Sequence, residues 1–293
     1  MNIPRRLVKK ILNEWTFFWK LVRSDLLSTI IPGILVTISS LIYYDIDLKQ
    51  STTTILIALI YFSLYVYTFT ITNQLNTIEE DKINKPFRPL PSGITSKKEM
   101  IVRELLFTFI FLLFGFYFGI IKWALLWVVV STFHNFIGHK YWISKNIISM
   151  SLGIFSIIGA GWELTQPIKG YPLQWGIIIS LVFGLCAVIQ DFRDVKGDKL
   201  INRKTLPIDL GDFRARLISI LFSLLSYILL LIFVFIPSNK TLLAYIFGLI
   251  ITFLFLIIIG RLLFFKTEKD DHYTYTILLY LFNVVLFTGF IYL

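Results

Sequence analysis

The chain has 293 residues, of which 56% are hydrophobic and only 16% are charged. Soluble domains are normally about one-quarter charged, so this composition excludes an ordinary soluble protein and indicates a polytopic membrane protein. The net charge of +10 does not require nucleic acid as a partner, because an anionic membrane leaflet also attracts a basic face. We expect residues 1–293 to form a single integral membrane domain in the lipid bilayer, with no obligate protein partner.

The first residues, MNIPRRLVKKILNEW, are basic but precede no small-residue cleavage site, so we expect no signal peptide. Apolar runs then predict an all-α bundle of nine transmembrane helices, although several runs are shorter than the roughly 20 residues of a straight crossing. The third and fourth runs are nearly continuous, and we place the turn between them at 119–122. The predicted spans are 25–44, 54–74, 102–119, 120–137, 146–162, 173–190, 214–236, 242–264 and 273–292.

Basic residues are distributed unevenly between the two sides of this predicted bundle. All but four of the 28 Lys and Arg residues lie in the N-terminal segment or beside the loops after the second, fourth, sixth and eighth spans. The positive-inside rule therefore places the N-terminus in the cytoplasm. Both long polar segments, 75–101 and 191–213, then face the cytoplasm, and we expect a cavity that opens on that side. The four basic residues on the other side are Lys49, Lys122, Lys169 and Lys240.

The second polar segment begins with QDFRDVKGD, residues 190–198, directly after an apolar run. If the helix continues, offsets of three, four and seven residues place Asp191, Asp194 and Asp198 on one face. Like charges at these spacings repel, and charge at the end of a lipid-spanning helix is costly. We therefore expect a cationic group against this face.

The first polar segment, NQLNTIEEDKINKPFRPLPSG at 73–93, has a similar layout. Asn73, Thr77 and Asp81 repeat at four-residue steps with Glu80 beside them, and the chain then becomes basic and proline-containing. Two acidic helix ends on one side of a bundle, each followed by Lys and Arg, could bind metal ions and a polyanion. Hard oxygen ligands with room for water and phosphate oxygens suit Mg²⁺.

These strings resemble a known family. QDFRDVKGD followed by RKTLP is similar to the second Asp-rich motif of the UbiA superfamily of intramembrane prenyltransferases, and DKINKPFRPLPSG is similar to the segment that closes its first motif. The family's first motif usually reads N-D-x-x-D-x-x-x-D, whereas this chain has Asn73, Gln74, Thr77 and Asp81 at the matching positions. This variant, together with HNFIGHKYWISKN at 134–146, most resembles the terpene cyclase branch of the superfamily.

The resemblance implies Mg²⁺-dependent ionisation of an allylic prenyl diphosphate, C15 or C20, followed by intramolecular cyclisation and release of pyrophosphate. The alternative is transfer of the prenyl group to an aromatic, quinone-precursor or tetrapyrrole acceptor. Metal ions and basic donors stabilise charge on the leaving oxygen. The expected metal ligands are Asn73, Glu80, Asp81, Asp191, Asp194 and Asp198, of which all but Glu80 are also assigned as catalytic. The expected diphosphate ligands are Arg88, Lys145, Arg203 and Lys204.

These residues also allow other interpretations. The basic side chains could be topology signals alone, and the first acidic group could be a capped helix end. A secondary transporter would place its acids near mid-membrane, whereas these lie at the boundary. A scaffold would not need two acidic faces on one side. His134, His139 and His272 lie too far apart in sequence for a local metal motif, so they receive no catalytic role.

Overall fold

The structure is a computed structural model that describes residues 5–238 and 241–293. Helices dominate this part of the chain, and its only bridge-type pairing is an isolated parallel contact between Tyr141 and Lys204. The prediction of an all-α protein is confirmed. The helices are α1 (Arg5–Val22), α2 (Ile31–Tyr43), α3 (Leu48–Asn76), α4 (Ile78–Asn84), α5 (Lys97–Tyr117), α6 (Ile121–Phe136), α7 (Ser151–Glu163), α8 (Tyr171–Cys186), α9 (Asp191–Leu200), α10 (Leu206–Leu210), α11 (Asp212–Leu230), α12 (Leu242–Phe264), α13 (Glu268–Phe287) and α14 (Gly289–Tyr292).

Short turns of tighter or wider helix join several of these elements. The 3-10 turns are η1 (Arg23–Asp25), η3 (Gly138–Lys140) and η5 (Ala187–Gln190), and the π-helical turns are η2 (Leu26–Ile30), η4 (Ile143–Met150) and η6 (Leu231–Phe235). A π turn inserts an extra residue and changes which side chains face the bundle interior, and such turns are frequent at functional sites. Two of them, η2 and η4, lie near the polar segments described below.

Seven continuous helices in the described residues are long and apolar enough to cross a membrane. Two further predicted spans, 120–137 and 273–292, are also helical but fall short, since α6 has only 16 residues and the first turn of α13 is acidic. A bundle of nine crossings therefore stays a prediction. The seven are Leu12–Tyr43, Leu48–Asn76, Lys97–Tyr117, Ile143–Glu163, Tyr171–Leu200, Asp212–Phe235 and Leu242–Phe264.

The turn expected between the third and fourth spans is present. α5 ends at Tyr117 and α6 begins at Ile121, with Gly119 between them at a φ of 74°. A residue with a side chain rarely adopts this left-handed conformation, whereas glycine does so at little cost. The apolar stretch is thus divided where its glycine permits a reversal of direction.

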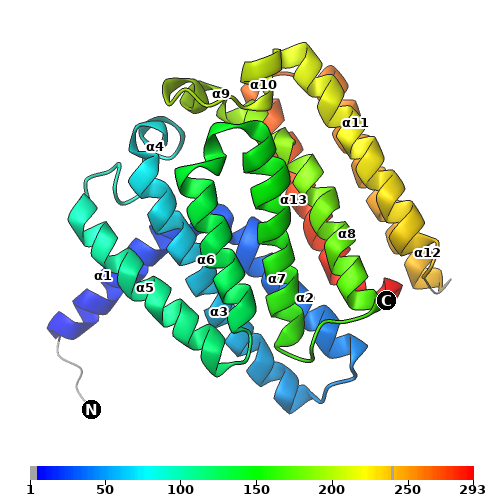
Figure 1. Cartoon of the computed structure of the whole chain (residues 1–293), viewed down its shortest axis with the longest axis horizontal. Coiled ribbons are helices and arrows are strands. Elements are labelled where there is room, and N and C mark those ends of the chain that lie inside the picture. Colours follow the sequence, from blue (N-terminus) through cyan, green and yellow to red (C-terminus); the bar gives the residue numbers. More distant parts are fainter. Residues whose placement is uncertain (1–4, 239–240) are drawn as a thin grey trace.

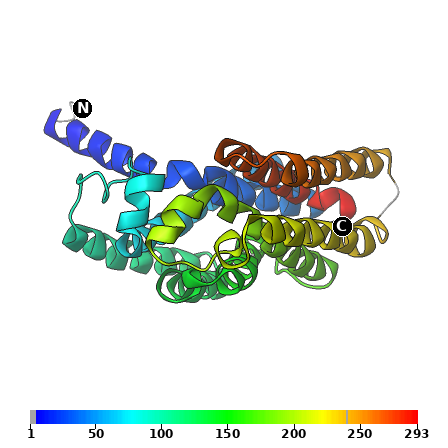
Figure 2. The same cartoon turned by 90° about the horizontal axis from the view of Figure 1, so that it is seen from above.

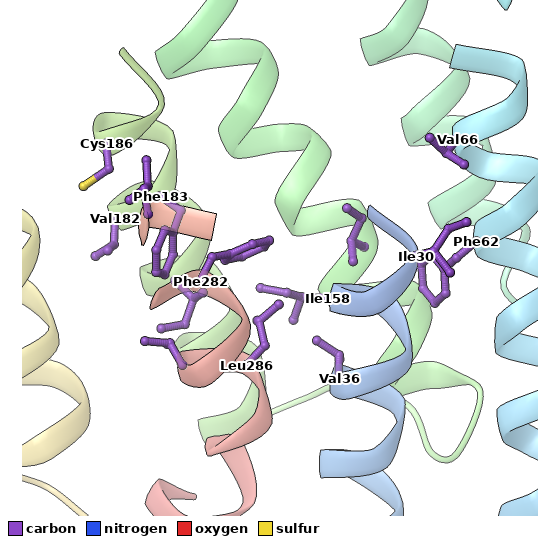
Figure 3. Packing of buried hydrophobic residues seen from close by; sticks show 14 of the residues in the cluster. Ile30, Val36, Phe62, Val66, Ile158, Val182, Phe183, Cys186, Phe282 and Leu286 are labelled. Atoms are coloured by element: carbon purple, nitrogen blue, oxygen red, sulfur yellow. The ribbon is translucent and has the colours of Figure 1, made fainter. Parts of the chain in front are cut away.

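Close packing between α2, α3, α7, α8 and α13 forms the bundle core. Figure 3 shows Phe183 of α8 facing Phe282 of α13, with ring centroids 4.7 Å apart, and Ile158 of α7 between α13 and α2. At Gly33 of α2, an added Cβ would overlap the ring of Phe62 on α3. Small residues of this kind let helices approach closely where lipid provides no hydrophobic driving force for their association.

The two polar segments lie at the same end of the bundle. Figure 1 shows α4, α9 and α10 together at the top, and α4 contacts α9. Figure 2, seen from above, also places these short helices next to each other. The connections α2–α3, α5–α6 and α7–α8 lie at the opposite end (Figure 1). Lys49, Lys122 and Lys169 are in or beside those connections, and Lys240 lies outside the described residues.

Cysteine labelling tests which end faces the cytoplasm. Because the basic residues mark the cytoplasmic side, Lys97→Cys and Ile201→Cys should react with a membrane-impermeant maleimide only in inverted vesicles. Lys169→Cys should react only in right-side-out vesicles. The native Cys186 is buried, and the unmodified chain serves as the control for its reactivity. Labelling of positions 97 and 201 from opposite sides would contradict the shared cytoplasmic location.

Candidate active site

The aspartates of the second polar segment lie on a helix that extends the apolar α8. The turn η5 connects α8 to α9, and α9 begins at Asp191. Asp191 and Asp198 are fully buried, whereas Asp194 lines a cavity between the helices. Asp194 contacts Arg193, whose Nε lies 3.3 Å from its Oδ2. The segment therefore presents two buried carboxylates and one carboxylate that faces the cavity.

Lys145 is the cation against the two buried aspartates. Its Nζ lies 2.7 Å from Asp191 Oδ1 and 3.8 Å from Asp198 Oδ2. The second oxygen of Asp191 accepts a hydrogen bond of 2.6 Å from the Asn146 amide. Lys145 comes from the π turn η4, and it is itself buried. The expectation of a cationic group against the aspartates is confirmed, and the group is a side chain of the chain itself.

Arg203 connects the second polar segment to the first. Its Nη1 lies 2.7 Å from Asp198 Oδ1 and 2.9 Å from Glu80 Oε2. The backbone N–H of Arg203 also donates to the Asp198 carbonyl at 3.0 Å, which fixes the loop after α9. Burial raises the pKa of the Glu80 carboxyl, and the nearby Arg203 guanidinium opposes that rise. The guanidinium thus holds the acids of α4 and α9 together.

Arg88 organises the first polar segment in the same way. Its Nη1 lies 2.9 Å from Asp81 Oδ2 and donates to Asn73 Oδ1 at 3.2 Å. Its Nη2 lies 3.5 Å from Asp25 Oδ2, and the Arg88 side chain is almost fully buried. Asn73 in turn donates to the side-chain carbonyl of Asn135 on α6 at 3.1 Å. Arg88, Asp81 and Asn73, which the sequence placed in one site, are therefore in direct contact.

Several cavity residues were not predicted from the sequence. Asp25, Lys85, Arg193 and Tyr275 line the cavity, and the Arg193 guanidinium lies 4.0 Å from the centre of the Tyr275 ring. Burial lowers the pKa of Lys85, and the positive charge of Arg88 adds to the effect. Asp25 and Tyr275 come from the first and last parts of the bundle, so no local spacing linked them to the two motifs.

Lys204 is not brought to the cavity. Its side chain is exposed and lies 6.0 Å from the centre of the Tyr141 ring, and it is absent from the cavity lining. Its backbone N–H donates to the Lys140 carbonyl at 2.8 Å, so the chain pairs here with the loop before η4. This pairing turns Arg203 inward and Lys204 outward. The cavity gives no support to Lys204 as a diphosphate ligand.

The cavity has a volume of about 160 Å³ and is partly open, and its lining changes along its length. Basic, acidic and amide side chains line one end. Aromatic and aliphatic side chains line the other, among them Tyr65, Phe69, Trp127, Ile154 and Ile157. Tyr65 and Trp127 are stacked, with ring centroids 3.9 Å apart and an interplanar angle of 11°. The Trp127 indole N–H donates to the Tyr65 carbonyl at 3.0 Å, so this aromatic pair is held in place.

Among the described residues, no three His, Cys, Asp or Glu side chains converge closely enough to hold a metal ion by themselves. The reason is visible in the pairings, since Lys145, Arg203 and Arg88 lie between the carboxylates. The predicted metal ligands are therefore gathered around one cavity and paired with basic side chains.

A sequence profile identifies the class of protein. The profile of the UbiA prenyltransferase family matches residues 27–287, and the chain belongs to this family. The chain is 29% identical over 216 residues to somaliensene A/B synthase from Streptomyces somaliensis, which covers 73% of this chain and 72% of the relative. It is 31% identical over 216 residues to the diterpene cyclase eriG from Hericium erinaceus, covering 73% and 70% of the two chains. A polyprenyl transferase, eriF, from the same fungus is 29% identical over 213 residues, covering 71% and 73%.

Solved structures share the fold. A structure of digeranylgeranylglyceryl phosphate synthase superimposes with a TM-score of 0.68 at 22% identity, covering 96% of this chain and 98% of that one. A UbiA homologue from Archaeoglobus fulgidus bound to GPP and Mg²⁺ gives a TM-score of 0.65 at 14% identity, covering 93% and 99%. At these identities the comparison shows the membrane-embedded helical fold of the family.

Two substitutions separate the structural from the chemical role of the acids. Asp198→Asn removes one of the two carboxylates that contact the buried Arg203. Breaking a buried ion pair lowers the free energy of unfolding by up to about 3–5 kcal/mol. We expect a clearly lower melting temperature in detergent together with lost activity. Asp194→Asn, at a partly exposed position that faces the cavity, should lose activity with a much smaller thermal shift. Glu79→Gln, at an exposed pair with Lys82, is the control and should melt like the wild type. Equal melting of Asp198→Asn and Glu79→Gln would contradict the buried pairing.

Proposed function

We propose that this protein is a Mg²⁺-dependent enzyme that ionises a C15 or C20 allylic prenyl diphosphate and cyclises the prenyl chain to a terpene, releasing pyrophosphate. In this proposal residues 1–293 form one domain of nine membrane helices. The N-terminus, both polar segments and the cavity mouth face the cytoplasm. The observation that carries the proposal is the division of one cavity into a charged end and an aromatic, apolar end.

The charged end suits a diphosphate. Lys85, Arg88, Lys145, Arg193 and Arg203 all line the cavity there. Arginine fits phosphate oxygens with two parallel hydrogen bonds, and lysine acts as a compact point charge. Bond cleavage leaves the electron pair of the allylic C–O bond on the diphosphate. These five side chains are placed to bind that group before and after cleavage, when its negative charge is greatest.

The same end also fits Mg²⁺. Five basic side chains there face six carboxylates, three lining the cavity (Asp25, Glu80 and Asp194) and three buried behind it (Asp81, Asp191 and Asp198). A diphosphate adds more negative charge, which favours further cations. Asp198 Oδ2 is buried without a hydrogen-bond partner, with Lys145 Nζ 3.8 Å away, and Mg²⁺ often takes only one or two carboxylates besides water and substrate phosphate. Asn73, Glu80, Asp81, Asp191, Asp194 and Asp198 would hold it, and once bound it would stabilise the leaving oxygen.

The apolar end suits a reacting isoprenoid chain. Its aliphatic and aromatic side chains exclude water, which would otherwise capture an allylic cation. The faces of Tyr65, Trp127 and Phe69 can stabilise a cation by about 0.5–2 kcal/mol each. Held in place by the Trp127 hydrogen bond, the stacked pair offers a fixed surface against which the chain can fold.

Cyclisation is favoured over transfer because the deep part of the cavity offers little to orient a polar acceptor. Its lining there is aromatic and aliphatic, with His134 at the boundary to the charged end. Similarity to a somaliensene synthase and a diterpene cyclase supports the same choice. Transfer to an acceptor is the second candidate, because eriF is nearly as similar and bears the name of a polyprenyl transferase.

Incubation without an acceptor distinguishes the two candidates. We expect purified protein with Mg²⁺ and a C15 or C20 diphosphate to release pyrophosphate and form a cyclic hydrocarbon or alcohol, detected by gas chromatography and mass spectrometry. EDTA should abolish both products. Turnover that begins only when a hydroxybenzoate, quinone precursor or tetrapyrrole is added would establish the transferase instead. Full activity in EDTA would refute the metal assignment.

Metal and diphosphate should bind cooperatively. Lys145 already neutralises Asp191 and Asp198, so Mg²⁺ alone must compete with a buried ammonium group. Inorganic pyrophosphate gives that ammonium another partner. We expect pyrophosphate to tighten Mg²⁺ binding by about tenfold or more, within the usual range of coupling between sites.

Calorimetric titration, corrected for the Mg²⁺–pyrophosphate complex in solution, measures this coupling. Lys145→Gln should bind Mg²⁺ alone more tightly than the wild type and show weaker coupling. Lys204→Gln, whose side chain lies outside the cavity, is the matched control and should behave as the wild type does. Unchanged coupling in Lys145→Gln would show that this lysine does not compete with the metal.

A further inference from the structure

We propose that His134 is the base that removes the proton ending the cyclisation. The inference rests on the proposed function and assigns a catalytic residue within it. His134 lies in the last turn of α6, lines the cavity and is 5% exposed. Neither Asp-rich motif contains it, and its role does not follow from its spacing to another histidine.

The imidazole of His134 is buried and its Nδ1 has no hydrogen-bond partner among the described residues. The ring packs against Phe69, with centroids 5.6 Å apart. Its backbone carbonyl lies 3.2 Å from His139 Nδ1. A buried polar atom without a partner carries a free-energy cost. Such a cost is expected at a buried atom that interacts with a bound molecule.

The carboxylates that line the cavity are already engaged. Asp25 pairs with Arg88, Glu80 with Arg203, and Asp194 with Arg193. A carboxylate held by a guanidinium is a weaker base, and the amides of the lining do not accept protons. The neutral imidazole therefore offers a lone pair that no neighbouring cation occupies.

A base requires the neutral form of the imidazole. The His134 ring is buried beside the charged end of the cavity, to which Lys145 and Arg203 belong. A neutral ring at the boundary between the charged and aromatic ends adds no repulsion to a cation formed beside it. A tertiary carbocation is a strong enough acid to protonate any such nitrogen.

The proposed step is a proton transfer from the cyclised chain to His134. A C–H bond next to the cationic carbon of the cyclised chain breaks, and its electron pair forms the C=C bond of the product. The proton is taken by the lone pair of the His134 imidazole, giving an imidazolium. The imidazolium then passes its proton to the released pyrophosphate or to solvent at the open end. No oxidant, reductant or further reactant is needed.

Product analysis of three variants tests this assignment. His134→Phe keeps an aromatic ring against Phe69 but has no nitrogen, and His134→Gln keeps polar atoms but has no basic lone pair. Each variant and the wild type would be assayed in parallel, with Mg²⁺ and the C15 or C20 diphosphate that the wild type accepts. Pyrophosphate release and the distribution of hydrocarbon and alcohol products would be measured in the same reactions. His272→Gln, at an exposed histidine that does not line the cavity, is the matched control.

We expect both His134 variants to release pyrophosphate at rates within a few-fold of the wild type. The main alkene should fall by about tenfold or more relative to water-captured alcohols and isomeric alkenes, consistent with the usual contribution of a general base. His272→Gln should give the wild-type products. The use of two different replacements keeps the test valid if one variant folds poorly.

An unchanged product distribution in either folded His134 variant would overturn the assignment. So would an equal loss of pyrophosphate release and of all products, since that pattern belongs to a residue that positions the diphosphate. Both results leave the proposed cyclase intact as long as the wild type cyclises. If the wild type forms no product without an acceptor, the cyclase proposal fails first and the assignment of His134 fails with it.

Discussion

The burial of carboxylates at the edge of a membrane bundle is the constraint on which the rest of this structure depends. Removing a carboxylate from water costs several kcal/mol unless a cation and hydrogen bonds compensate. Asp81, Asp191 and Asp198 are all buried, and each has a basic partner within 3 Å. Those partners, Arg88, Lys145 and Arg203, come from loops or irregular turns, so these segments are held in place by the requirement to neutralise the acids.

The same pairs give the site its chemical character. Arg203 joins acids of α4 and α9, and Arg88 joins α3, α4 and the turn η1. The acids are therefore neutralised within the protein, and the cations that neutralise them line the cavity. In the proposed site, a bound polyanion would draw on those cations, and the carboxylates would then become available to another positive partner. The contacts that stabilise the protein without ligand would be the same ones that bind a charged ligand.

The cavity combines this charged end with a rigid apolar end, and the order of the helices explains the combination. α3, α6 and α7 contribute residues to the apolar end, while their ends nearest the two polar segments and the turns beyond them contribute the polar groups. His134 lies where the two ends meet, near Lys145 and Arg203 but against Phe69. A bundle of membrane helices around a cavity that is open to water at one end produces such a gradient of polarity without any additional domain.

The sequence by itself determined the membrane class, the helical fold, the turn at Gly119 and the two acidic segments, because hydropathy, charge and glycine conformation act locally. It also predicted a cation opposite the aspartates, since buried like charges require one. Only the tertiary structure decided that this cation is Lys145, that Lys204 turns outward, and that Asp25, Tyr275 and His134 join the site. Those outcomes depend on how distant helices rotate and pack against each other, which no local spacing specifies.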